Sequence, residues 1–128
     1  PAADARRFDA GTPPVPNIYA GLAGISLVEE AGVPAIEEHV RALNTRLLDG
    51  LEELGGQVPT PRDPARRGPL VCVRSTDVDA LVAALAGERI VVSSRDESVR
   101  IAAHLYNTEE DVDRVLEALR ARRHLLAS

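Results

Sequence analysis

Apolar residues recur at helical spacing through the first part of the chain. Ile18, Leu22 and Ile25 fall on one helical face, which predicts a helix over residues 16–31. A second stripe follows Pro34, a residue that suits the first turn of a helix. Its members are Ile36, Val40, Leu43, Leu47, Leu51 and Leu54, and a glycine pair closes it. The sequence therefore predicts two consecutive helices at the start of the chain.

Short apolar runs replace the long stripes in the second part. Residues 57–69 hold four prolines, which favours a short edge strand followed by an exposed loop. Compact apolar runs at 70–74, 90–93 and 99–103 predict three more strands, and a polar turn joins the last two. Hairpin-linked strands of this kind indicate a mainly antiparallel sheet.

Two more helices are expected among these strands. Thr76 and Asp79 have the spacing of a capping box ahead of a helix whose apolar face holds Val78, Leu81, Val82 and Leu85. Thr108 is expected to cap a last helix with Val112, Val115, Leu116 and Leu119 on one face. The predicted order is α-α-β-β-α-β-β-α. This is an α+β fold in one domain over residues 1–128, with helices covering the sheet.

Composition narrows the function classes. The net charge of −5 and the lack of a basic stripe argue against a nucleic-acid partner, and no apolar run is long enough to span a membrane. The beginning of the chain lacks the apolar core of a signal peptide, and a single cysteine fits a reducing compartment, so a cytoplasmic location is expected. All fifteen basic residues are arginine, so no side-chain amine here can form a Schiff base.

One candidate site lies just before the first predicted helix. In "RRFDAGTPPVP", Gly11 and Thr12 offer a hydroxyl and backbone amides close to a helix N-terminus, an arrangement that favours an anion such as phosphate. The alternative is a plain turn that leads into the helix.

A second candidate is Arg100, which stands in a predicted strand of valine, isoleucine and alanine. A guanidinium beside an apolar sheet is costly unless it meets a carboxylate, so Arg100 is a candidate for binding an acid. The alternative is an arginine that reaches solvent or pairs with Asp96 or Glu97.

The other reactive side chains give weaker indications of function. Cys72 lies between two valines and is expected to be a small buried apolar residue rather than a nucleophile. The three histidines, at 39, 104 and 124, are scattered without metal-ligand spacing, so no metal site is expected. No serine stands in a nucleophile-elbow motif.

Two segments taken together resemble a known family. The runs "RRFDAGTPPVPNIYAGLAGISLVEEAG" and "VRIAAHLYNTEEDVDRVLEAL" are similar, in order and spacing, to the C-terminal part of class V aminotransferases. This group of fold type I pyridoxal-phosphate enzymes includes cysteine desulfurases and kynureninases. Its specific points here are the Arg-Phe-Asp-Ala-Gly-Thr run and the arginine that precedes Tyr-Asn-Thr.

The resemblance implies roles for individual residues. Thr12 would contact the phosphate of pyridoxal phosphate in the partner subunit of a homodimer, with Gly11 allowing close approach. Arg100 would bind the α-carboxylate of an amino-acid substrate. Tyr106, Asn107 and Thr108 would close the last strand and cap the last helix. No catalytic residue is expected in this chain.

The resemblance also implies that the chain is one part of a larger enzyme. It would be the small C-terminal domain, with residues 1–15 leading in from a large domain that carries the Schiff-base lysine. The fragment alone would then be inactive, and the expected activity is that of a class V aminotransferase-like transferase.

The subtype stays open between transamination, epimerisation, elimination and kynureninase-like cleavage. A desulfurase is disfavoured, because the family places its reactive cysteine on a loop before the carboxylate-binding arginine and residues 86–99 contain none. The alternative reading is a free-standing module, without cofactor, that binds a small acid or dimerises.

Overall fold

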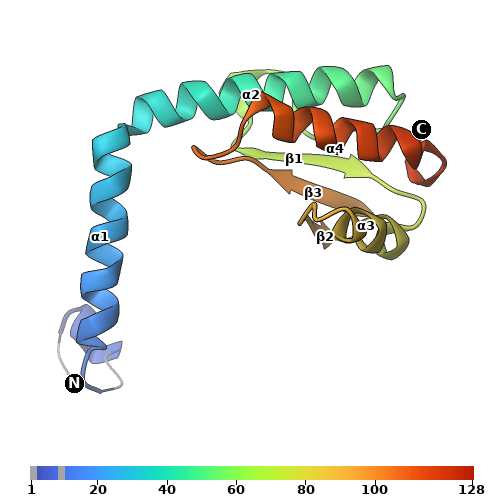
Figure 1. The fold of residues 1–128 in the computed structure, drawn as a ribbon. Coiled ribbons are helices and arrows are strands. Elements are labelled where there is room, and N and C mark those ends of the chain that lie inside the picture. Colours follow the sequence, from blue (N-terminus) through green and yellow to red (C-terminus); the bar gives the residue numbers. More distant parts are fainter. Residues whose placement is uncertain (1–2, 9–10) are drawn as a thin grey trace. The chain divides into compact units, whose positions relative to one another are not determined.

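A computed structural model of the chain describes residues 3–8 and 11–128. The chain divides into two compact units, Pro1–Val33 and Pro34–Ser128, and each is considered by itself. The elements along the chain (Figure 1) are η1 (Ala5–Phe8), α1 (Val15–Ala31), α2 (Val33–Glu53), η2 (Pro64–Arg66), β1 (Leu70–Arg74), α3 (Val78–Gly87), β2 (Ser93–Arg95), β3 (Ser98–Ala102), α4 (Glu109–Ala121) and η3 (Arg123–Leu125).

The first unit is dominated by α1, which confirms the helix predicted over residues 16–31. Pro14 occupies its N-cap without a side-chain hydrogen bond, and the amide of Gly32 closes its C-terminus on the Val28 carbonyl. A φ of 82° at Gly32 lies in the left-handed region, where glycine is favoured. None of the residues of α1 is buried, and large apolar side chains such as Ile18, Leu22 and Ile25 are exposed.

The second unit is built on a three-stranded antiparallel sheet in the order β1-β3-β2. β3 is the central strand. Arg100 lies at its middle, opposite Cys72 of β1 and Ser93 of β2. The predicted α+β class with an antiparallel sheet is confirmed.

Buried and less buried side chains alternate along the strands, so one face of the sheet packs against the core and the other does not. Val71, Val73, Val99 and Ile101 are buried, while their neighbours on the strands are half-buried or exposed. Figure 1 shows α2 and α4 along one face of the sheet. The core between them also takes residues from α3, namely Leu81 and Leu85, beside Leu43, Leu47, Leu48 and Leu51 of α2 and Leu119 of α4.

α2 and α4 approach closely because one of them carries a glycine at the contact. A Cβ added at Gly50 would lie 2.4 Å from a Cδ atom of Leu116, so α4 packs into space that any larger residue would fill. Arg46 of α2 donates two hydrogen bonds to Asp113 of α4, at 2.7 and 2.8 Å. Packing and charge thus hold the two helices together.

The prediction of a strand within residues 57–69 is wrong. Gln57 and Thr60 do reach the outer edge of β1: the Gln57 carbonyl accepts from the Arg74 amide, and the Thr60 hydroxyl accepts from the Cys72 amide. Pro59 and Pro61 flank Thr60 and carry no N–H, so a continuous ladder cannot form. The described residues therefore contain three strands where four were predicted.

Two further predictions need correction. Asp77, not Thr76, is the N-cap of α3, and its carboxylate accepts from the Ala80 amide. The strand predicted at 90–93 begins only at Ser93. The amide of Ile90 donates to the Leu85 carbonyl at the end of α3, so this amide cannot take part in strand pairing.

Candidate functional site

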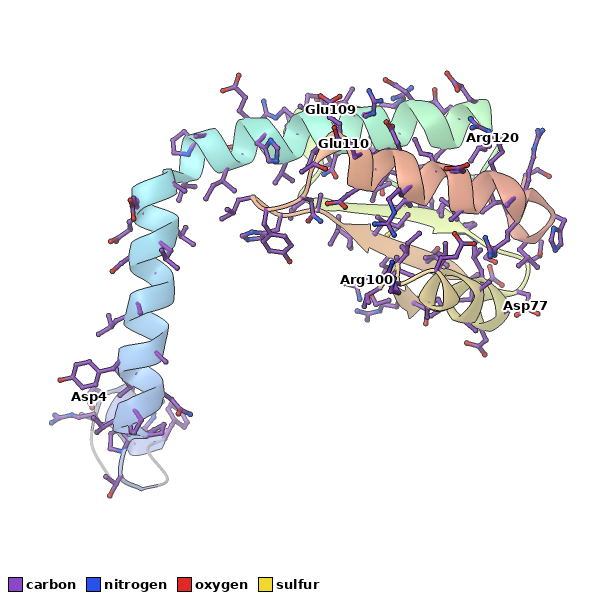
Figure 2. The ribbon with its side chains drawn as sticks, viewed as in Figure 1. Asp4, Asp77, Arg100, Glu109, Glu110 and Arg120 are labelled. Atoms are coloured by element: carbon purple, nitrogen blue, oxygen red, sulfur yellow. The ribbon has the colours of Figure 1, made fainter. Side chains whose placement is uncertain are left out.

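Within the second unit, Arg100 stands on the sheet face opposite the one that α2 and α4 cover. Its neighbours Val99 and Ile101 are buried, and Arg100 itself is half-buried on the opposite face. Figure 2 shows it on the side of the sheet away from α4. The cross-strand row on this face is Cys72, Arg100 and Ser93.

Among the residues that the structure describes, no carboxylate forms an ion pair with Arg100. The alternative that it pairs with Asp96 or Glu97 is therefore wrong. Glu97 instead pairs with Arg74 at 3.0 Å. Arg100 is thus a half-buried residue without a carboxylate partner in the described part of the chain, which leaves two of the interpretations open: its guanidinium reaches solvent, or it takes an external acid.

Cys72 is half-buried rather than buried, which corrects the expectation. Its side chain lies on the same face of the sheet as Arg100, because residues paired across antiparallel strands point to the same side. The sequence did not predict this, because valines on both sides of Cys72 are compatible with a strand whether Cys72 faces the core or the opposite side.

The turn after β3 is fixed by Asn107. Its side-chain oxygen accepts from the His104 amide at 2.9 Å, and its side-chain nitrogen donates to Asp111 at 3.2 Å. Its carbonyl oxygen lies 2.9 Å from Nε2 of His39, which ties the turn to α2 when that nitrogen carries the proton. His39 and Asn107 are 68 positions apart, so no local sequence pattern predicts their contact.

Thr108 caps α4, as predicted, and forms a capping box with Asp111. The pKa of Asp111 is lowered from its ordinary value, first by the hydrogen bond from Asn107 and then by the backbone amide of Thr108. This network anchors the end of the strand that carries Arg100.

The Gly11–Thr12 segment is exposed and has few backbone donors. Pro13, Pro14 and Pro16 carry no N–H, and the amides of Asn17 and Ile18 both donate to the Pro14 carbonyl. The backbone donors of the segment are therefore the amides of Gly11, Thr12 and Val15, beside the hydroxyl of Thr12.

Within residues 3–8 and 11–128, no three histidine, cysteine, aspartate or glutamate side chains converge to hold a metal ion. In the same part, no helix combines the length and the apolar character needed to cross a bilayer.

The sequence profile of the family described as aminotransferase class-V matches residues 2–115. The chain belongs to this family. The match includes both the Gly11–Thr12 segment and the strand with Arg100, and it confirms the resemblance inferred from the two motifs.

Named members of the class-V aminotransferase family share about a quarter of the residues. The uncharacterized aminotransferase YcbU of Bacillus subtilis is 28% identical over 92% of this chain and 32% of its own length. A probable cysteine desulfurase of Halalkalibacterium halodurans is 29% identical over 88% of this chain and 31% of its own. The chain thus spans about a third of the length of these relatives.

Solved structures give the same fold. An apo cysteine desulfurase from Thermococcus onnurineus superposes with a TM-score of 0.85 at 26% identity, over 94% of this chain and 34% of that one. A NifS-like protein superposes with a TM-score of 0.74 at 27% identity, over 88% of this chain and 34% of that one.

The family implies pyridoxal phosphate, and the described residues fit one side of such a group. Thr12 supplies a hydroxyl and an amide, and a Cβ added at Gly11 would meet nothing within 4 Å, so a phosphate can approach here. The chain contains no lysine for covalent attachment. The fit is that of a peripheral phosphate contact rather than of a complete cofactor site.

Proposed function

We propose that this chain is the substrate-side part of a pyridoxal-phosphate-dependent, class-V aminotransferase-like enzyme that acts on an amino acid. The observation that carries the proposal is Arg100, a half-buried residue of the central strand without a carboxylate partner among the described residues, in the motif to which the resemblance gives the carboxylate-binding role. Its planar fork suits a bidentate contact with an α-carboxylate. The cofactor, when bound, supplies the electron sink for the chemistry at the α-carbon.

The remaining residues orient this contact. β3 holds Arg100 between two paired strands, and the Asn107 network fixes the turn that follows. Thr12 is proposed to donate to the cofactor phosphate, in the partner subunit of a homodimer. The lysine that attaches the cofactor then lies outside these 128 residues.

The proposal disfavours desulfurase activity. β2 and β3 are joined by Asp96 and Glu97 alone, and the loop between α3 and β2 contains no cysteine. Cys72, the single cysteine, lies within β1. We expect no sulfide release from L-cysteine by the protein that contains this chain, and no loss of its transferase activity in Cys72→Ser.

The first test is Arg100→Ala in the protein that contains this chain, after a screen of amino acids against keto-acid acceptors has found its substrate. KM for the amino acid should rise about 30-fold or more, because losing the partner of a buried carboxylate costs about 2–5 kcal/mol. Cofactor content should not change. The matched control is Arg120→Ala, an exposed arginine of α4. An unchanged KM in Arg100→Ala would remove Arg100 from the site.

The second test addresses Thr12. Thr12→Ala should lower cofactor retention on dialysis of the dimer and leave KM for the amino acid nearly unchanged. Ser26→Ala is the control, because Ser26 is an exposed hydroxyl residue of the same unit whose hydrogen bond stays within α1. Equal retention in both variants would contradict the role of Thr12.

The free-standing alternative makes a different prediction. If the chain were a complete acid-binding module, its 128 residues would bind amino acids through Arg100 without any cofactor. Calorimetry on the chain alone, with Arg100→Ala as control, separates the two readings.

A further inference from the structure

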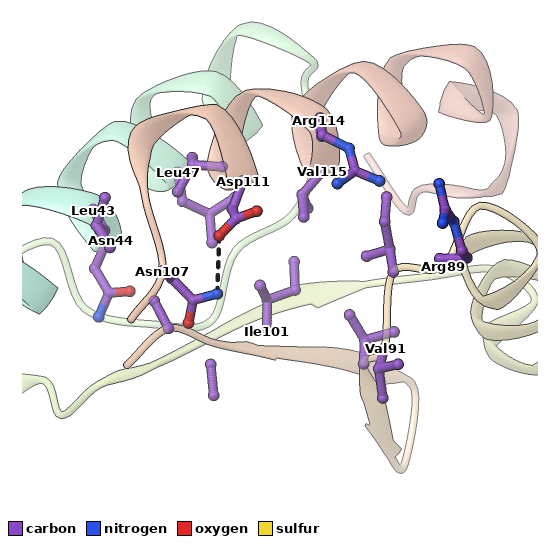
Figure 3. Close-up of a pocket in the computed structure, with 15 residues that line it drawn as sticks. Leu43, Asn44, Leu47, Arg89, Val91, Ile101, Asn107, Asp111, Arg114 and Val115 are labelled. Carbon is purple, nitrogen blue, oxygen red and sulfur yellow. Dashed lines mark hydrogen bonds between the residues drawn. The ribbon is translucent and has the colours of Figure 1, made fainter. Parts of the chain in front are cut away.

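A pocket of about 170 Å³ lies within the second unit, between α2, α4, β3 and the segment that leads into β2. Its walls are mainly apolar, with Leu43, Leu47, Ile101 and Val115 among them (Figure 3). Ile101 points to the opposite face of β3 from Arg100. The pocket is therefore separate from the site proposed above.

One end of this pocket holds a buried polar group without a donor. Asn44 of α2 is 1% exposed, and its side-chain oxygen has no hydrogen-bond partner among the described residues. Its side-chain nitrogen reaches the Gly68 carbonyl at 3.4 Å. Figure 3 shows Asn44 beside Asn107, with its amide at the edge of the pocket. A buried acceptor left without a donor is costly, so this end favours a ligand with an O–H or N–H group.

The other end carries positive charge. Figure 3 shows the side chains of Arg89 and Arg114 at the end away from Asn44, with Ile101 and Val115 between the two ends. Neither arginine forms an ion pair with another residue that the structure describes; Arg114 donates to the Glu88 carbonyl at 3.5 Å.

The nearby carboxylates are already engaged. Asp111 accepts hydrogen bonds from Asn107 and from the Thr108 amide. The carboxylate of Glu88 pairs with Arg122. The pocket lining therefore holds two guanidinium groups, from Arg89 and Arg114, and a single carboxylate, Asp111, which already accepts hydrogen bonds from other groups. This excess of positive charge favours an anionic ligand group beside the two arginines.

Arg89 is also held in an unfavourable backbone conformation. Its φ of 62° places it in the left-handed region just after α3, a position where glycine is usual. Its side chain is exposed and lines the pocket, so no burial in the core accounts for an arginine there. A strained residue that lines a pocket is a reason to look for a ligand.

We propose that this pocket binds a small organic acid: a carboxylate for Arg89 and Arg114, a short apolar body, and a hydroxyl or amine donor for the Asn44 oxygen. The site is distinct from the Arg100 face and does not depend on the proposed function. The apolar walls hold the body, and the two polar ends set its direction.

The probe is 4-hydroxyphenylacetate, which has all three features. Phenylacetate lacks the distal donor, and tyramine lacks the carboxylate. We expect saturable binding of 4-hydroxyphenylacetate to the chain, with methyl NMR shifts at Leu47 and Val115. Phenylacetate and tyramine should each bind about tenfold or more weakly. Affinity weaker than millimolar, or equal affinity for all three, would overturn the proposal.

Variants locate the binding. Arg89→Gly should weaken 4-hydroxyphenylacetate binding about tenfold while relieving the backbone strain, so failure to fold is not expected. Asn44→Ala should abolish the preference for 4-hydroxyphenylacetate over phenylacetate. Arg120→Gln, outside the pocket, should change nothing. If Arg100→Ala abolishes binding and Arg89→Gly does not, the probe occupies the Arg100 face and the pocket proposal is wrong.

Discussion

Arg89→Gly should stabilise the fold although it removes a long side chain. A left-handed backbone costs a non-glycine residue about 1–2 kcal/mol, and glycine adopts it freely. Against this, glycine gives the unfolded chain additional freedom worth about 0.5–1 kcal/mol. Arg89 is exposed and pairs with no carboxylate in the described part of the chain, so little else is lost. The free energy of unfolding should rise by about 0.5–1 kcal/mol.

Urea unfolding followed by far-ultraviolet circular dichroism measures this change. With a slope of about 1–3 kcal/mol per molar urea, the midpoint should rise by about 0.2–1 M. Arg95→Gly is the matched control, because Arg95 is an exposed arginine of β2 whose φ is not positive. It should lower the midpoint, since glycine weakens a strand. If Arg89→Gly lowers the midpoint as much as Arg95→Gly does, the strain argument fails.

Two further predictions concern the second unit. Leu119→Ala removes a side chain with no exposed area from the core and should lower the free energy of unfolding by about 3–5 kcal/mol in the same urea assay. The lowered pKa of Asp111 makes a contribution to stability that is present above its ordinary value of 3.8 and is lost as the pH falls through its folded value. Urea midpoints measured from about pH 5 to pH 2 should therefore fall more steeply for the natural chain than for Asp111→Asn, and equal slopes would contradict this.

Local pattern was sufficient where each element follows its own periodicity. The α2 stripe is correct because buried positions on a packed helix must repeat at its turn, and Leu43, Leu47 and Leu51 are all buried. The cap at Thr108 is correct because its partner lies three residues away. The segments with Thr12 and with Arg100, taken together, indicated the family, and the family profile confirms it.

Features that depend on distant partners were not predictable. His39 meets Asn107 only in the folded chain. Likewise, Glu97 pairs with Arg74 and not with Arg100 only once the sheet has formed. The residue types do not predict the left-handed backbone conformation of Arg89, because that conformation follows from the way α3 ends. The orphaned oxygen of Asn44 likewise depends on which groups α2 meets.

The alternation of β3 has a consequence for how such a protein can change over evolutionary time. Val99 and Ile101 carry the packing, while Ser98, Arg100 and Ala102 lie on the opposite face of the same strand. If Arg100 binds the substrate as proposed, substitutions at 98 and 100 alter what is bound without disturbing the core, whereas Ala102 also lines the pocket beside α2 and α4. On that proposal, one short strand keeps selection for folding and selection for specificity on separate residues, and a library confined to 98 and 100 explores new ligands at little risk to the scaffold.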